Sequence, residues 1–228
     1  MSVDRIILWR HGQTSWNIEN RFQGHTDIPL NEVGEFQVKH AASLLAGMQP
    51  TKIVSSDLQR AKKTADALAE LVGAEVQVDI RLRETSGGLW EGNTGEDNRR
   101  THPDEFAAWL NGSDEPAGIT GERRSEVAAR VSAAIHDGIK DASGAVVFVA
   151  HGGTIRCGLG SMLQLPVPLW PTLGGLANAS WSVLEKNYAG RWMLAEHNAG
   201  SIPEPVFGDE GAEQVGLPSN QTGLWRSW

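Results

Sequence analysis

The chain has 228 residues, 40% of them hydrophobic and 21% charged, which is the composition of a globular protein with room for a full hydrophobic core. Its formal net charge of −8 at pH 7 argues against nonspecific binding to nucleic acid or to anionic membranes, since both require a basic surface. Cys157 is the single cysteine, and the sequence has neither a signal peptide nor a long apolar run, so we expect a cytoplasmic protein without membrane contact.

The first third of the chain alternates predicted strands with predicted helices. Short runs of apolar and β-branched residues, each bounded by turn residues, predict strands over residues 5–10, 52–55 and 75–78. Apolar residues at helical spacing predict two helices, over residues 33–48 and 58–71. Asn31 and Asp57 are the expected N-caps of these helices, and Gly73 ends the second one.

The segment from residue 80 to residue 121 contains little strand signal. Its pattern predicts one short helix, residues 104–111. Connections of this length in compact domains are usually functional. We therefore expect residues 80–121 to form a lid-like insertion.

The next part of the chain contains the strongest strand signal. Residues 145–150 are continuously apolar, which is typical of a central strand covered by helices on both faces. The other predicted elements are helices 122–140 and 153–163 and a hairpin of strands 180–185 and 191–196. Residues 200–228 are rich in Gly, Pro, Ser and acids, which predicts a weakly ordered tail.

This alternation predicts an α/β fold with three layers, in which helices cover both faces of a mostly parallel central sheet. Residues 1–199 are expected to form the domain, with residues 80–121 inserted in it and residues 200–228 following it as the tail.

Candidate catalytic groups follow four of the predicted strands. They are, in chain order, Arg10, His11, Arg60, Glu84 and His151. The carboxyl ends of parallel strands line one crevice, so we expect these side chains to meet there. Each residue alone is a weak signal, but their occurrence together after four strands indicates one functional site.

These residue types suit phosphoryl transfer. Guanidinium groups bind phosphoryl oxygens in pairs and stay charged at any working pH. A neutral His11 can attack phosphorus, and Gly12 is expected to let the backbone approach the imidazole ring and fix its tautomer. His151 is expected to donate a hydrogen bond to the phosphoryl oxygens, while Glu84 protonates the leaving alkoxide and later deprotonates water.

Three motifs carry a family resemblance. They are Leu8-Trp9-Arg10-His11-Gly12-Gln13-Thr14 with its continuation to Leu30, then Ser55-Ser56-Asp57-Leu58-Gln59-Arg60-Ala61, and Ala150-His151-Gly152-Gly153. Through them the chain resembles the histidine phosphatase superfamily, whose members include the cofactor-dependent phosphoglycerate mutases. The resemblance covers residues 5–198.

The resemblance implies a phosphoglycerate mutase-like fold and a set of roles. His11 is the residue that becomes phosphorylated, Glu84 is the acid and base, and the remaining catalytic residues are Arg10, Arg60 and His151. The implied substrate contacts are Asn17, Gln23, Gly24 and Gly152. The substrate is then a small phosphorylated molecule, with no metal and no cofactor, and the family suggests a homodimer.

The sequence departs from the mutases in ways that favour hydrolysis. Thr85–Leu89 follow Glu84 where mutases have Arg-x-Tyr-Gly, and Trp109 lacks the pair of arginines that follows it in mutases. Gly153 stands where mutases have Asn. The chain has no Cys-x5-Arg loop, no Asp-x-Asp motif and no Walker loop, so other common phosphoryl-transfer chemistries are unsupported.

A closer resemblance lies in residues 165–175 and 178–181, which are similar to the actinobacterial glucosyl-3-phosphoglycerate phosphatases of this superfamily. It implies a sugar-linked phosphoglycerate as substrate and a place in methylglucose lipopolysaccharide synthesis. A tryptophan such as Trp90 or Trp170 would then stack against the glucose.

Several alternatives stay open at this point. The chain could hydrolyse another small phosphomonoester, act as a phosphoglycerate mutase, or be a noncatalytic phosphate-binding module. Arg123 and Arg124 are interpreted as a solvated helix start, with substrate contact as the alternative.

Overall fold

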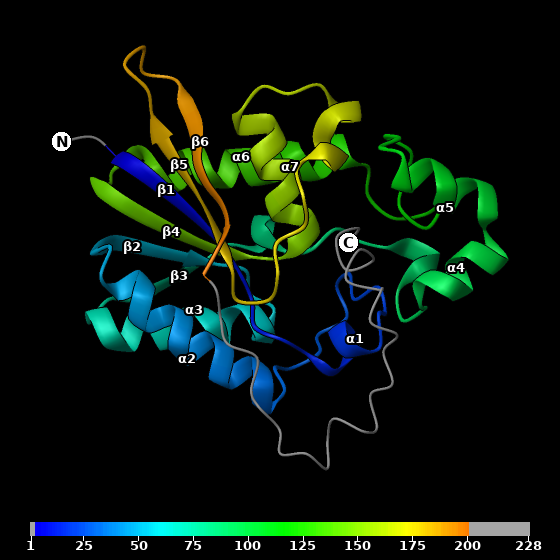
Figure 1. The fold of residues 1–228 in the computed structure, drawn as a ribbon, viewed down its shortest axis with the longest axis horizontal. Helices are drawn as coiled ribbons and strands as arrows, with labels where there is room; N and C mark the ends of the chain where they lie inside the picture. Colours follow the sequence, from blue (N-terminus) through cyan, green and yellow to red (C-terminus); the bar gives the residue numbers. More distant parts are fainter. Residues whose placement is uncertain (1–2, 201–228) are drawn as a thin grey trace, which may run out of the picture.

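The computed structural model describes residues 3–200, which form a six-stranded sheet in the order β3-β2-β4-β1-β5-β6 (Figure 1). The strands are β1 (Val3–Arg10), β2 (Pro50–Ser55), β3 (Val76–Val78), β4 (Gly144–Ala150), β5 (Trp181–Lys186) and β6 (Trp192–Ala199). The first four run parallel, β5 runs antiparallel to β1, and β6 runs antiparallel to β5. The prediction of a mostly parallel sheet ending in a hairpin is confirmed.

Helices cover both faces of the sheet, so the expected three layers are present (Figure 1). Strand side chains alternate between the faces. Ile7 and Trp9 pack with α2 (Glu32–Ala46) and α3 (Gln59–Val72), whereas Ile6 and Leu8 pack with α6 (Arg124–Lys140) and α7 (Gly152–Met162). β1 is therefore buried on both sides and places the residue that follows it, His11, at the end of a rigid strand.

Helix α2 packs unusually close to the turn after β1. A Cβ on Gly12 would lie 2.5 Å from the carbonyl oxygen of Gly34, and a Cβ on Gly34 would lie 2.1 Å from the carbonyl oxygen of Gln13. Both positions therefore require glycine. Asn31 caps α2 as predicted, by accepting a hydrogen bond from the backbone N–H of Gly34 at 2.8 Å.

The predicted cap of α3 is wrong. Asp57 does not cap the helix, because its carboxylate forms an ion pair with Arg83. The backbone N–H of Gln59 instead donates to Asp27 Oδ1 at 2.8 Å. The start of α3 is thus tied to a distant loop, which helps to place Arg60 in its first turn.

Residues 80–121 carry more regular structure than the sequence predicts. They contain the 3-10 turns η1 (Ile80–Leu82) and η2 (Gly88–Trp90) and the helices α4 (Gly95–Thr101) and α5 (Pro103–Leu110). Trp90, Phe106 and Ala117 form a small core of their own. Figure 1 shows α4 and α5 beyond the carboxyl end of the parallel strands, away from both helical layers.

The remaining elements are short: α1 (Ser15–Ile18) and the 3-10 turn η3 (Val167–Thr172). Across residues 3–200, no helix has the length and apolarity to cross a membrane. The predicted tail lies outside the described residues, apart from residue 200. The division into a domain, a lid-like insertion and a tail stays a prediction.

Candidate active site

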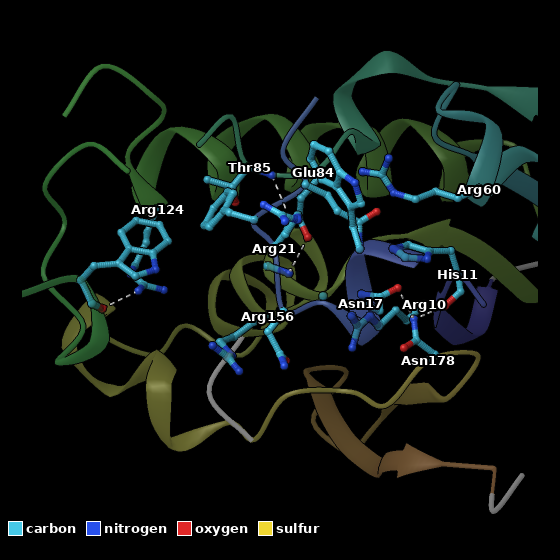
Figure 2. Close-up of a pocket in the computed structure, with 17 residues that line it drawn as sticks. Arg10, His11, Asn17, Arg21, Arg60, Glu84, Thr85, Arg124, Arg156 and Asn178 are labelled. Atoms are coloured by element: carbon cyan, nitrogen blue, oxygen red, sulfur yellow. Dashed lines mark hydrogen bonds between the residues drawn. The ribbon is translucent and has the colours of Figure 1, made fainter. Parts of the chain in front are cut away.

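A pocket opens at the carboxyl ends of β1 and β4 and at the first turns of α3 and α7 (Figure 2). It is lined by Arg10, His11, Trp16, Asn17, Asn20, Arg21, Phe22, Gln23, Arg60, Glu84, Thr85, Trp109, Arg124, Gly152, Gly153, Arg156 and Asn178. Most of the predicted site residues are therefore brought together, as the parallel topology requires.

His11 is buried and held in one tautomer. Its Nδ1 lies 2.6 Å from the carbonyl oxygen of Gly12, so Nδ1 carries the proton and Nε2 keeps its lone pair. Burial, reinforced by the charges of Arg60 and Arg10, lowers the pKa of His11 well below 6.5. The ring is therefore neutral at pH 7 and has the form that a nucleophile requires.

The predicted reason for Gly12 needs a correction. Its carbonyl does fix the His11 tautomer, but a carbonyl is available in any residue. What excludes a side chain at Gly12 is the approach of α2 at Gly34 and Val38, not the approach of the imidazole ring.

Arg60 is fully buried and is held from three sides. Its Nη1 donates to the carbonyl of Thr26 at 2.8 Å, its Nη2 to that of Gly24 at 2.9 Å, and its Nε to His151 Nδ1 at 3.2 Å. Arg10 donates from Nη1 to the carbonyl of Leu176. Burial lowers the pKa of both guanidinium groups to about 10, so both remain charged at pH 7.

His151 lies beside His11, with ring centroids 5.1 Å apart, but its ring is fully buried and does not line the pocket. Its Nδ1 accepts from Arg60, and its Nε2 lies 3.0 Å from Ser56 Oγ. A hydrogen bond from this ring to a phosphoryl oxygen requires the Ser56 contact to be exchanged. Gly24 is also outside the pocket wall, and its carbonyl supports Arg60.

The carboxylate of Glu84 lies against the first turn of α7. It accepts backbone hydrogen bonds from Thr85 at 2.8 Å, Gly153 at 3.1 Å and Thr154 at 3.0 Å. Its own carbonyl oxygen accepts from Arg130 Nη2 at 2.9 Å, and His25 Nε2 lies 2.8 Å from it. Arg130 was not predicted, yet it fixes the backbone that presents Glu84 to the pocket.

This arrangement agrees with what comparison with known proteins finds. Residues 6–199 match the model of the histidine phosphatase superfamily (branch 1). The chain belongs to this superfamily. It is 40% identical over 216 residues to glucosyl-3-phosphoglycerate phosphatase of Mycobacterium tuberculosis, covering 87% of this chain and 96% of that protein.

Two further similarities point the same way. The enzyme of the same name from Mycolicibacterium vanbaalenii is 42% identical over 190 residues, which is 79% of this chain and 84% of that protein. The solved structure of mycobacterial glucosyl-3-phosphoglycerate phosphatase in complex with VO3 superimposes with a TM-score of 0.82 at 41% identity, covering 86% of this chain and 100% of that one. The expected phosphoglycerate mutase-like fold is thus confirmed as the histidine phosphatase fold.

Some side chains of this histidine phosphatase site were missed in the sequence. Asn178 donates from Nδ2 to the carbonyls of His11 and Gly12, each at 3.2 Å, and to Asn17 Oδ1 at 3.1 Å. These bonds hold Asn17 on the pocket wall, where it was predicted to lie. Asn178 belongs to a segment without regular structure, so periodicity could not single it out.

Two interpretations from the sequence are wrong. Trp90 lies in the small core of residues 80–121, and Trp170 packs against Gly160, so neither lines the pocket; Trp16 and Trp109 do. Arg124 is 5% exposed and lines the pocket, so it is not a solvated residue. Within residues 3–200, no cluster of His, Cys, Asp and Glu has the composition of a metal site.

Proposed function

We propose that this chain is a phosphatase that hydrolyses glucosyl-3-phosphoglycerate to glucosylglycerate and inorganic phosphate through a phosphohistidine at His11. The observation that carries the proposal is a neutral, tautomer-fixed histidine beside two buried guanidinium groups. The similarity to glucosyl-3-phosphoglycerate phosphatases supports the choice of substrate.

In the first step, His11 Nε2 attacks phosphorus and forms a P–N bond while the bond from phosphorus to the ester oxygen breaks. Arg10 and Arg60 bind the non-bridging oxygens and stabilise the charge that spreads over them in the transition state. Glu84, in its acid form, gives its proton to the leaving alkoxide, which departs as the free alcohol.

In the second step, water attacks the phosphohistidine. The Glu84 carboxylate takes a proton from this water, and the P–N bond breaks to release inorganic phosphate and neutral His11. Arg130 contributes indirectly, since its bond to the Glu84 carbonyl holds the acid and base in place. Gln23, Asn17 and the backbone of Gly152 bind the substrate in this proposal, and Gly24 acts by holding Arg60.

We further propose that residues 80–121 close over the bound substrate and that the protein is a cytoplasmic homodimer. Trp109 of α5 lies on the pocket wall, which supports the closure of this segment over the substrate. Size-exclusion chromatography with light scattering tests the homodimer directly.

Phosphorus NMR of the protein with glucosyl-3-phosphoglycerate, 3-phosphoglycerate and a trace of 2,3-bisphosphoglycerate in one tube tests the function. We expect inorganic phosphate to grow at the expense of the glucosylated ester and not to form with the His11→Ala variant. A 2-phosphoglycerate signal would make the protein a mutase. If 3-phosphoglycerate disappears first, or if neither ester changes, the proposed substrate is wrong.

A further inference from the structure

Arg156 is a buried charge that has no hydrogen-bond or ion-pair partner among residues 3–200. It lies on α7, one turn after Gly152, is 8% exposed, and lines the pocket. Its Nε is buried without a hydrogen-bond acceptor, and no residue in the described range 3–200 forms an ion pair with its guanidinium group. Burial lowers the pKa of its guanidinium group, and this effect outweighs the opposing charge of Glu84.

Arg130 shows how an arginine with a full set of protein partners is held in this fold. Its guanidinium group donates to the carbonyls of Arg81, Arg83 and Glu84 and is paired with Glu122. Arg156 has none of these partners. A buried, unpaired cation is unfavourable to folding, so its presence in a pocket wall suggests that a ligand supplies the missing anion.

A second arginine reinforces the positive charge around Arg156. Arg124 stacks over Trp109, with 3.7 Å from its guanidinium carbon to the ring centroid, and donates from Nη2 to the Trp109 carbonyl at 2.6 Å. Figure 2 shows Arg124 and Arg156 at the end of the pocket opposite His11 and Arg60.

The acidic groups near this end form no ion pair with Arg124 or Arg156 among the described residues. Among the described residues, Glu84 is the single carboxylate on the pocket wall, and backbone N–H groups already occupy its oxygens. The charge of Asp114 acts to raise the pKa of Arg124, against the larger effect of burial. Its Oδ1 accepts a hydrogen bond from the backbone N–H of Ser125. Cys157, next to Arg156, is a neutral thiol, because burial raises its pKa to about 12.

We propose that Arg156, with Arg124 beside it, forms a second anion-binding subsite that binds a carboxylate of the substrate while the phosphoryl group lies against His11. This inference rests on the proposed function and adds to it that the preferred substrates are phosphorylated hydroxy acids. A planar guanidinium group matches a carboxylate with two parallel hydrogen bonds. Phosphomonoesters without a carboxylate leave Arg156 unpaired and bind more weakly.

The test compares two ligands that differ at one group: 3-phosphoglycerate, and glycerol 3-phosphate, which has a hydroxymethyl group in place of the carboxylate. Their dissociation constants are measured by calorimetry in a His11→Ala background, so that turnover does not interfere. We expect 3-phosphoglycerate to bind about 10- to 150-fold more tightly, as a hydrogen-bonded charge pair would give. Adding Arg156→Met should reduce this ratio to within about threefold of one.

Arg123→Met is the matched control, because Arg123 precedes Arg124 but does not line the pocket. It removes the same formal charge and should preserve the ratio, which separates a local subsite from the general field of the protein. If the two ligands bind equally well to the His11→Ala protein, in which Arg156 is still present, the proposal is overturned. An unchanged ratio in the Arg156→Met variant, including an equal loss of both affinities, would overturn it too.

These outcomes are independent of the proposed function. The phosphorus NMR experiment reports whether phosphate is released, whereas the ratio of affinities reports whether a carboxylate is recognised. If the protein hydrolyses glucosyl-3-phosphoglycerate but Arg156→Met leaves the ratio of the two affinities unchanged, only the subsite is rejected. If Arg156→Met brings the ratio of the two affinities close to one but the protein releases no phosphate, only the proposed phosphatase activity is rejected.

Discussion

The two buried histidines predict that mild acid destabilises this protein. Burial, with the charge of Arg60, lowers the pKa of both His11 and His151 well below 6.5. Below pH 6.5 the unfolded chain binds a proton at each histidine and the folded chain does not, so stability is fully present above pH 6.5 and falls as the pH drops. If neither ring takes up a proton in the folded state, lowering the pH from 7 to 5.5 costs about 1.3 kcal/mol per histidine, or about 2.5 kcal/mol together.

Urea denaturation at pH 7.0, 6.0 and 5.5 measures this loss. The carboxylates whose pKa values are lowered, such as Asp57 and Asp79, lose their contribution only at lower pH and do not interfere. His11→Gln and His151→Gln should each remove about half of the pH dependence. A wild-type loss below about 1 kcal/mol, or a loss that neither variant makes smaller than in the wild type, would refute the reasoning.

Three further predictions follow from the geometry. Glu84→Gln should lower kcat/KM for an alkyl phosphate about 100-fold or more but that for p-nitrophenyl phosphate far less, because a phenolate needs little protonation; equal losses would show that Glu84 is not the acid. Arg130→Met should reproduce this leaving-group dependence more weakly, at about 10-fold, and a uniform loss would reduce Arg130 to a stabilising residue. Gly12→Ala should lower the free energy of unfolding, measured in urea, by about 1–3 kcal/mol. Gly174→Ala is the control and should be nearly neutral, because its Cβ would meet only His197 at 3.9 Å. Similar values for the two variants would contradict the close approach of α2.

The parts of the fold that the sequence predicts are those with local causes. The apolar run of β4 and the Asn31 cap of α2 are properties of neighbouring residues, and both were predicted correctly. The cap of α3 was not, since Asp57 pairs with Arg83 from a later turn and Asp27 takes its place from an earlier loop. Because the partners are distant in the sequence, no local sequence pattern predicts these two contacts.

The same distinction holds for the site. Residues directly after parallel strands, such as His11, could be placed because the topology brings strand ends together. Arg124 and Arg156 lie on helices, and their direction depends on how α6 and α7 pack. One signal was available for Arg156, because it is the single charge in the otherwise small and apolar sequence of α7.

The most direct test of the account is to look for the phosphoryl group on His11 during turnover. The enzyme is mixed rapidly with glucosyl-3-phosphoglycerate, quenched in alkali to preserve phosphohistidine, digested and analysed by mass spectrometry. The account predicts one phosphorylated peptide, which contains His11, and its absence from the His11→Ala variant. A phosphoryl group on another residue, or release of phosphate with none on His11 at any quench time, would contradict it.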